Sequence, residues 1–400
     1  MKNKLKLAIA VVLLVAASAL AEEKQKEIKV AAICNAYSYY WHADVIVTRF
    51  LAGFSTGQGL IPPKVRIASM YLDQESPDNL GRKIAEQYKI PIYPTVAKAL
   101  TLGGDELAVD AVLFIGEHGK YPHNRFGATM YPRMKTAVEI FRVFDFSKRS
   151  VPLFHDKHLS YNWLDSKWIY DRANELDVPM MAGSCLPLAY HNPPLEHPLG
   201  SKITEAVVLL YASPDSYGVH GMEMLQCMVE RRKGGESGIA SVQCVRGKAF
   251  YEAARDGRIS MELIEAAAGT IDSKKPGKME DHAGNPTGMI LEYVDGLRAT
   301  VVMDHGYYGT NWAYAAKVDG EVKATQFAHT LSSFSYLGLN IQEMFLTGRP
   351  QYPVERTLLA SGVVDAALRS MAAGGSIVGT PHLHITVSYT HLTLPTILLV

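Results

Sequence analysis

The sequence carries no excess charge of either sign, because its 400 residues include 40 lysines and arginines and 40 aspartates and glutamates. A protein that binds the phosphate backbone of nucleic acid usually presents a basic surface. We therefore expect no nucleic-acid partner. The remaining composition, 48% apolar and 20% charged, is that of a globular protein long enough for two domains.

Cysteine is scarce: the sequence has four, at positions 34, 185, 227 and 244, and no C-x-x-C pair. A chain of this length can bury a large core and does not need disulfide bonds to fold. A bridge between Cys227 and Cys244 remains open in an oxidising compartment. We expect free thiols instead, packed as small apolar side chains.

The apolar run at residues 7–17 is too short to span a membrane comfortably. Three lysines precede it and the small-residue stretch Ala19-Leu20-Ala21 follows, so residues 1–21 are interpreted as a secretory signal peptide; an uncleaved anchor is the alternative. No Arg-Arg pair precedes the run and no cysteine follows it, which favours the general secretory route. We expect an exported protein, periplasmic or extracellular, without a membrane span after cleavage.

The end of the chain, residues 387–400, begins with "VSYTHLTLPT", which a common transposase sequencing adapter can encode. We interpret this tail as a translated library artefact and exclude it from functional reasoning. The alternative is a genuine apolar tail strand.

Strands and helices alternate regularly through the first half. Apolar runs predict strands at 29–34, 65–73, 109–116, 151–156 and 178–183, and amphipathic segments predict helices near 42–50, 78–88, 131–144 and 162–176. Such alternation indicates a parallel, doubly wound α/β sheet over residues 28–184.

The second half, residues 185–386, has strands in succession. They are expected at 203–212, 239–245, 288–294, 297–303, 312–318 and 321–328, with helices at 218–230, 339–348 and 355–371. Asp295-Gly296 between two of these strands is a hairpin signal. The pattern predicts an α+β domain with an open, mostly antiparallel sheet and helices on one face.

Glycine is missing from one place where a doubly wound domain commonly needs it. The loop after the first strand, residues 35–42, reads "NAYSYYWH", whereas dinucleotide-binding loops carry G-x-G-x-x-G. Glycine lets the backbone approach a pyrophosphate closely, and the aromatic residues Tyr39, Tyr40 and Trp41 would crowd that position.

Several motifs, in order, resemble those of the glucose-fructose oxidoreductase / inositol dehydrogenase (Gfo/Idh/MocA) family from residue 28 to about 385. They include "LGRKIAEQYKIPIYPTVAKAL", "VDAVLFIGEHG", "FHDKHLS" and "SYGVHGMEML". The resemblance implies a Rossmann-like domain followed by an open-sheet domain, with the active site between them. It also implies NAD or NADP as cofactor, a sugar or polyol as substrate, and association into a homo-oligomer.

The resemblance implies catalytic roles for four residues. Lys157 matches the family's active-site lysine, and His220 matches its acid/base histidine. Glu223 lies three residues further on, where it could orient His220. The family's aspartate falls on Ser216, so the adjacent Asp215 is expected to replace it.

The expected cofactor site combines the first loop with the ends of three later strands. Asp73 ends the second strand, where the family's ribose-binding acid belongs. The expected cofactor-binding residues are Asn35, Tyr37, Ser38, Asp73, Glu117, His118 and Asp156.

Histidines and carboxylates follow several strands whose carboxyl ends should meet in one crevice. Imidazoles from His42, His118, His123, His155 and His158 would face His220 there. We expect an acid–base or carbohydrate site without a metal, although such residues are also metal ligands. Aromatic residues in the segment 304–314 suit the CH faces of a sugar.

The leading hypothesis is therefore an exported oxidoreductase that acts on a sugar or polyol with NAD or NADP. Two alternatives remain open. One is a relative that binds carbohydrate without a cofactor, and the other is a metal-assisted isomerase, lyase or hydrolase.

Overall fold

The computed structural model describes residues 27–386. The predicted signal peptide, residues 1–21, and the predicted artefact, residues 387–400, lie outside the described residues. Between residues 27 and 386 no helix combines the length and the apolar character that a membrane crossing requires.

The first sheet is parallel and has the strand order β4-β1-β5-β6-β7. Its strands are β1 (Ile28–Cys34), β4 (Val65–Leu72), β5 (Ala111–Ile115), β6 (Leu153–Asp156) and β7 (Met180–Gly183). The β5 residues are fully buried because helices cover both faces of the sheet. One face bears α5 (Val96–Leu100), α6 (Arg133–Ser147) and α7 (Trp163–Glu175), and near the other lie α2 (His42–Val47), α3 (Arg49–Ala52) and α4 (Leu80–Gln87).

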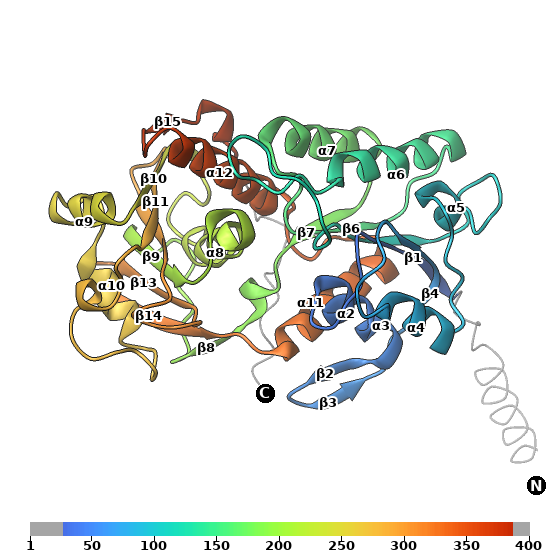
Figure 1. The fold of residues 1–400 in the computed structure, drawn as a ribbon, viewed down its shortest axis with the longest axis horizontal. Coiled ribbons are helices and arrows are strands. Elements are labelled where there is room, and N and C mark those ends of the chain that lie inside the picture. The colour runs from blue at the N-terminus through green and yellow to red at the C-terminus, as the bar shows by residue number, and fades with distance from the viewer. Residues whose placement is uncertain (1–26, 387–400) are drawn as a thin grey trace, which may run out of the picture.

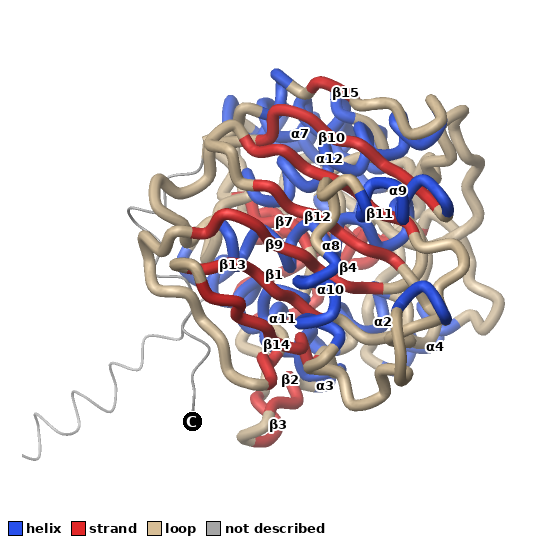
Figure 2. The backbone as a smooth tube through the Cα atoms, turned by 90° about the vertical axis from the view of Figure 1, so that its left-hand side faces the viewer, coloured by secondary structure: helices blue, strands red, loops and turns tan. Residues whose placement is uncertain are grey.

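Among residues 27–386 the second sheet has eight strands in the order β15-β10-β11-β12-β9-β13-β14-β8, and only its β12–β9 pair is parallel. Figure 2 shows the strands from β10 to β14 lying side by side. Its strands are β8 (Tyr190–Asn192), β9 (Ile203–Leu210), β10 (Ile239–Arg246), β11 (Thr287–Tyr293), β12 (Arg298–Met303), β13 (Ala313–Val318), β14 (Glu321–Ala328) and β15 (Val378–Gly379). The parallel sheet followed by a mostly antiparallel sheet confirms the predicted fold class.

Helices lie on both faces of this second sheet, so the expectation of helices on one face is wrong. The helices α8 (Pro214–Val229) and α12 (Glu355–Ala372) cover one face. Two helices absent from the prediction, α9 (Lys248–Arg255) and α10 (Met261–Ala268), cover the other through Phe250 and Leu263. Alternate β9 residues point to the two faces, as Val207 and Val208 show.

The C-terminal helices join the two halves (Figure 1). Helix α11 (Leu331–Thr347) begins eight residues before its expected start and packs near the hairpin β2 (Phe54–Thr56) and β3 (Gly59–Ile61). Phe50 and Phe345 have ring centroids 6.2 Å apart. One hydrophobic core therefore runs through both sheets.

All four cysteines are free, and Cys34, Cys185 and Cys244 are buried. The disulfide bond between Cys227 and Cys244, which the sequence left open, is not formed. The expectation of free thiols is confirmed. Burial raises the pKa of the Cys244 thiol to about 12, so it packs as a neutral side chain.

Candidate functional site

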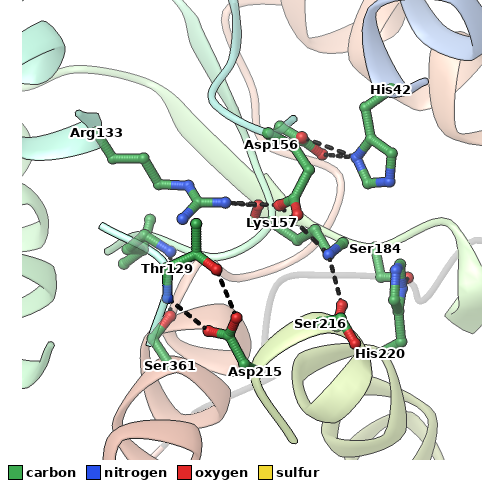
Figure 3. A network of polar contacts seen from close by, with 12 residues as sticks. His42, Thr129, Arg133, Asp156, Lys157, Ser184, Asp215, Ser216, His220 and Ser361 are labelled. Atoms are coloured by element: carbon green, nitrogen blue, oxygen red, sulfur yellow. Dashed lines mark hydrogen bonds and ion pairs between the residues drawn. The ribbon is translucent and has the colours of Figure 1, made fainter. Parts of the chain in front are cut away.

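A group of polar side chains lies where the carboxyl ends of β5, β6 and β7 meet α8 of the second half (Figure 3). We call it the junction cluster; its members are His42, Glu117, Arg133, Asp156, Lys157, Ser184 and His220. All except His42 are buried, and the His42 side chain is only 12% exposed. Buried polar groups at strand ends of a doubly wound sheet mark its usual ligand site.

Lys157 stands at the centre of the cluster and pairs with a carboxylate. Its Nζ lies 3.3 Å from Glu117 Oε2 and donates to the Ser216 carbonyl at 3.1 Å. Arg133 Nη2 donates to the same Glu117 oxygen at 2.6 Å and to the Lys157 carbonyl at 3.0 Å. Burial alone would raise the pKa of Glu117, but the charges of Lys157 and Arg133 hold it below its ordinary value.

His42 is held by Asp156. Its Nδ1 lies 2.9 and 2.8 Å from the two Asp156 carboxylate oxygens. Next to it, the His118 ring stacks on Trp41 with centroids 5.0 Å apart. Burial lowers the pKa of His118 to about 3, so this ring is neutral at ordinary pH.

His220 reaches the cluster from α8. Its Nδ1 lies 2.5 Å from Ser184 Oγ, at the end of β7. Burial lowers the pKa of His220 well below its usual value, with the nearby Lys157 and His42 as further causes. Tyr217 and Trp312 stack on each other with centroids 5.4 Å apart, and each lies within 6 Å of the His220 ring.

Two of the expected catalytic residues have other partners. Glu223 was expected to orient His220, but its carboxylate accepts from the Ser184 amide at 2.6 Å and the Thr357 hydroxyl at 2.6 Å. Asp215 accepts from the Thr129 amide and hydroxyl at 3.0 and 2.7 Å. Ser184, which contacts both Glu223 and His220, is thus the residue that orients the imidazole. Asp215 joins α8 to the loop after β5.

The aromatic segment 304–314 divides between core and site. Tyr307 and Tyr308 are fully buried under the second sheet, and Tyr308 donates to the Leu210 carbonyl at 2.8 Å. Only Trp312 of this segment lies beside His220. The remaining aromatic residues are sheet packing.

The histidines that the structure describes do not gather into a metal centre. Within residues 27–386 no group of three or more histidine, cysteine, aspartate or glutamate side chains could hold a metal ion. His123 is exposed in the loop after β5, whereas His155 and His158 are buried behind the junction cluster. Burial lowers the pKa of His155 to about 3.

The turn after β1 does not fit a dinucleotide phosphate, because its backbone amides already have acceptors within the protein. In nucleotide-binding turns, free backbone amides face the pyrophosphate. Here the Tyr39 amide donates to Asp78 at 3.1 Å and the Tyr40 amide to Asp44 at 2.9 Å. The Trp41 amide donates to the Ser38 carbonyl at 3.1 Å. Two carboxylates therefore occupy donors that a pyrophosphate would need.

Asp78 is held as an anion in this turn. Burial raises its pKa, but hydrogen bonds from Ser38, Ser76 and the Tyr39 and Leu80 amides outweigh that effect, and the pKa lies well below its usual value. The Ser38 hydroxyl donates to Asp78 at 2.7 Å. A phosphate here would meet a negative charge.

Two of the other expected cofactor residues, Asp73 and Tyr37, already have partners within the protein, whereas Asn35 keeps one polar group unpaired. Asp73 accepts from the hydroxyls of Tyr71 and Tyr121 at 2.9 and 2.7 Å, so both of its oxygens have partners. The buried Tyr37 contacts Thr48 through its hydroxyl at 2.7 Å. Asn35 is buried, and its side-chain amide nitrogen lacks a hydrogen-bond partner among the described residues.

Sequence reasoning missed three residues: Arg133, Ser184 and the role of Asp78 in the turn. Ser184 directly follows a predicted strand, which is a weak signal for a site residue. Arg133 opens a predicted helix, and nothing in its neighbourhood in the sequence indicates that it is fully buried beside Glu117.

No model of a protein family matches this sequence, and no curated protein is detectably similar to it in sequence. Solved structures do match. The myo-inositol 2-dehydrogenase from Lactobacillus plantarum is 10% identical, with a TM-score of 0.56 over 88% of this chain and 99% of that one. The fold is that of the Gfo/Idh/MocA inositol and aldose dehydrogenases.

Two further matches name ligands. GenD2 from gentamicin A biosynthesis, solved in complex with NAD, is 13% identical with a TM-score of 0.53 over 88% of this chain and 96% of that one. An aldose-aldose oxidoreductase from Caulobacter crescentus, complexed with glycerol, is 15% identical with a TM-score of 0.51 over 88% and 100%. At these identities the matches establish the fold.

Proposed function

We propose that the protein is a Gfo/Idh/MocA-type oxidoreductase acting on a hydroxyl group of a sugar or polyol, with Lys157 and His220 beside the reacting oxygen. The observation that carries this is the junction cluster, which places a buried ammonium and a buried imidazole from the two halves side by side. The fold shared with dehydrogenases supports the reaction class. The substrate class is supported by the matching myo-inositol 2-dehydrogenase and by the aldose-aldose oxidoreductase complexed with glycerol.

Lys157 is equipped to hold an oxygen. An ammonium carries three donors, and two of them point to Glu117 and to the Ser216 carbonyl. The third has no acceptor among the described residues and could meet a ligand hydroxyl, whose oxygen the positive charge would stabilise as its proton leaves. Glu117, fixed by Arg133, keeps the ammonium in place.

The turn after β1 favours a second function, that of a relative that binds a carbohydrate without a dinucleotide. Its amides are taken by Asp78 and Asp44, and Asp73 is taken by two tyrosines. The junction cluster serves either function, because binding a hydroxyl needs the same donors and acceptors.

We also propose that the protein works outside the cytoplasm, as the sequence of residues 1–21 supports. Association into a homo-oligomer stays a prediction. The helices α9 and α10 on the outer face of the second sheet leave less of that sheet free for it.

The deciding experiment uses mature protein, residues 22–386, purified from its own export route. After denaturation, mass spectrometry identifies released small molecules, and calorimetric titrations with NAD(H), NADP(H) and myo-inositol follow. Stoichiometric nucleotide would establish the oxidoreductase. Binding of myo-inositol or another polyol without nucleotide would establish the second function.

An Asp78→Ala variant sharpens the nucleotide titration, since it frees the Tyr39 amide and removes a negative charge from the turn. Asp105→Ala, at an exposed surface aspartate, is the matched control. We expect NADH affinity to rise in Asp78→Ala only. Absence of binding for every sugar, polyol and nucleotide tested would contradict both functions.

A further inference from the structure

The junction cluster contains two histidines that come from different halves of the chain and meet. The centroids of the His42 and His220 rings are 6.1 Å apart. Each ring is fastened at Nδ1 by a single side chain, His42 by Asp156 and His220 by Ser184. In Figure 3 the His42 ring lies above the His220 ring, and its edge away from Asp156 is turned toward it.

The partner of His42 sets its tautomer. A carboxylate only accepts hydrogen bonds, and both oxygens of Asp156 lie within 2.9 Å of Nδ1. Nδ1 must therefore carry the hydrogen. In the neutral ring, Nε2 then holds a lone pair and can accept a proton.

The partner of His220 sets the opposite tautomer. Ser184 Oγ already accepts from the Leu186 amide at 3.1 Å, and its own hydrogen has His220 Nδ1, 2.5 Å away, as its acceptor. If Nδ1 donated instead, the buried hydroxyl hydrogen would have no acceptor among the described residues, which is unfavourable. Ser184 therefore donates, and the hydrogen of the His220 ring lies on Nε2.

We propose that His42 is the proton acceptor and His220 the hydrogen-bond donor of the site, and that together they select a ligand hydroxyl. A hydroxyl is both donor and acceptor, so it can give its hydrogen to His42 Nε2 and accept from His220 Nε2–H. A carbonyl or a carboxylate satisfies only His220. This assignment rests on the proposed function for its ligand, and it adds His42 to the residues expected to touch that ligand.

Proton transfer in this arrangement is balanced. The ligand O–H bond breaks, the proton forms the second N–H bond of His42, and Asp156 offsets the new imidazolium charge. The ligand oxygen keeps the electron pair beside Lys157 and the His220 N–H. Ser184 and Asp156 act as positioning residues, because each works through its histidine.

Burial supports a neutral donor at His220. Burial is the largest cause of its lowered pKa. Lys157, His42, His329 and His158 lower the pKa further, because each disfavours a positive charge on the His220 ring. A neutral imidazole that donates from Nε2 polarises an oxygen without adding a charge.

The test is heteronuclear NMR of full mature protein carrying isotope-labelled histidine nitrogens, with His42→Gln and His220→Gln used to assign the two rings. We expect the hydrogen on Nδ1 of His42 and on Nε2 of His220. Observation of His220 with its hydrogen on Nδ1, or of His42 with its hydrogen on Nε2, would overturn the assignment.

Variants separate the positioning role from general packing. Ser184→Ala should convert His220 to a mixture of tautomers while His42 is unchanged, and Ser184→Thr, which keeps a hydroxyl, should restore the Nε2 form. If Ser184→Ala leaves His220 unaltered, the serine does not set the tautomer.

Spectra with added myo-inositol test the ligand separately: shifts at both rings support the hydroxyl assignment. The expected tautomers with no shift from myo-inositol, glucose or glycerol would contradict the proposed function and its ligand, and the assignment of the two rings would stand.

Discussion

At the scale of single residues, the junction cluster depends on buried charged side chains that contact a group of opposite charge. Lys157 and Arg133 share Glu117, so two cations and one carboxylate lie together away from water. Removing one partner of such a group leaves a buried charge uncompensated, which is usually costly. Because Arg133 contacts Glu117 independently of Lys157, the lysine is the member that can be removed with the least structural damage.

Lys157→Ala should therefore strongly reduce activity and preserve the fold. We expect kcat/KM toward the sugar or polyol to fall by at least ~10²-fold, the usual loss when a group that moves or holds the reacting proton is removed. Lys120→Ala, at an exposed lysine in the loop after β5, is the control. Normal turnover by Lys157→Ala would show that the lysine has no catalytic role.

Glu223 makes stability depend on pH. Burial raises the pKa of this carboxyl from 4.5 to about 7, so between these values the folded protein binds a proton that the unfolded chain releases. Its contribution is fully present below pH 4.5 and is lost as pH rises through 7, by an amount on the order of 3 kcal/mol.

Urea unfolding of wild type and Glu223→Gln between pH 4.5 and 8 measures that loss. The stability difference between the two proteins should change across this window in the direction that favours the glutamine variant at high pH. Glu106→Gln, at an exposed glutamate, should show a constant difference. A constant difference for Glu223→Gln as well would mean that its pKa is ordinary.

At the scale of elements, the turn that ends β7 brings His220, Ser184 and Glu223 together. Gly183 has a φ of +117°, and a Cβ there would collide with the Glu223 carboxylate and lie 2.6 Å from Thr357 Oγ1. Only glycine permits this backbone conformation and this close approach. The turn therefore lets Glu223 bind the Ser184 amide, and Ser184 in turn reaches His220.

Gly183→Ala should destabilise the protein by more than about 2 kcal/mol, from backbone strain together with displacement of Glu223. The control is Gly348→Ala at the end of α11, where φ is +70° but no atom lies within 4 Å of the added Cβ. It should cost only about 1 kcal/mol, the strain alone. Denaturant midpoints of the two variants give the comparison, and equal losses would contradict the predicted collision.

At the scale of the whole molecule, the two sheets share one core because the chain returns to its first half at the end. Helix α11 packs against the hairpin β2–β3, where a Cβ on Gly338 would lie 2.6 Å from the Phe54 ring. Arg49 Nε donates to Ser335 at 3.0 Å. The predicted division at residues 184 and 185 therefore separates two sequence regions whose cores are continuous.

A fragment of residues 28–184 should not fold independently, because removing α11 exposes the apolar side chains that it covers, such as Phe50 and Phe54. We expect the fragment to lack near-ultraviolet circular dichroism and a cooperative urea transition, whereas residues 28–386 should unfold in one main transition. A sharp transition for the fragment would show that the first sheet is self-sufficient.

Much of the fold is predictable from the sequence because its signals are local. Continuous apolar runs such as residues 109–116 indicate buried strands, and alternation with amphipathic segments indicates a parallel sheet. The helices α9 and α10 were missed because their segment lies between predicted strands. Lys157 and His220 were predicted from their motifs, and the structure places both in the junction cluster, whereas Ser184 and Arg133 have no such motif.

The sequence by itself determined the order of strands and helices, the balance of charge and the positions of Lys157 and His220. Only the tertiary structure decided what these residues contact. Asp156 meets His42 across 114 residues of sequence, and Ser184 meets His220 across 36. Such pairs form only when the two sheets pack, because the hydrogen bonds need both partners at one point in space and nothing in the local sequence specifies that point. The same holds for Asp78. The sequence places it at the start of a helix but does not reveal that it accepts hydrogen bonds from Ser38 and Tyr39 in the turn after β1.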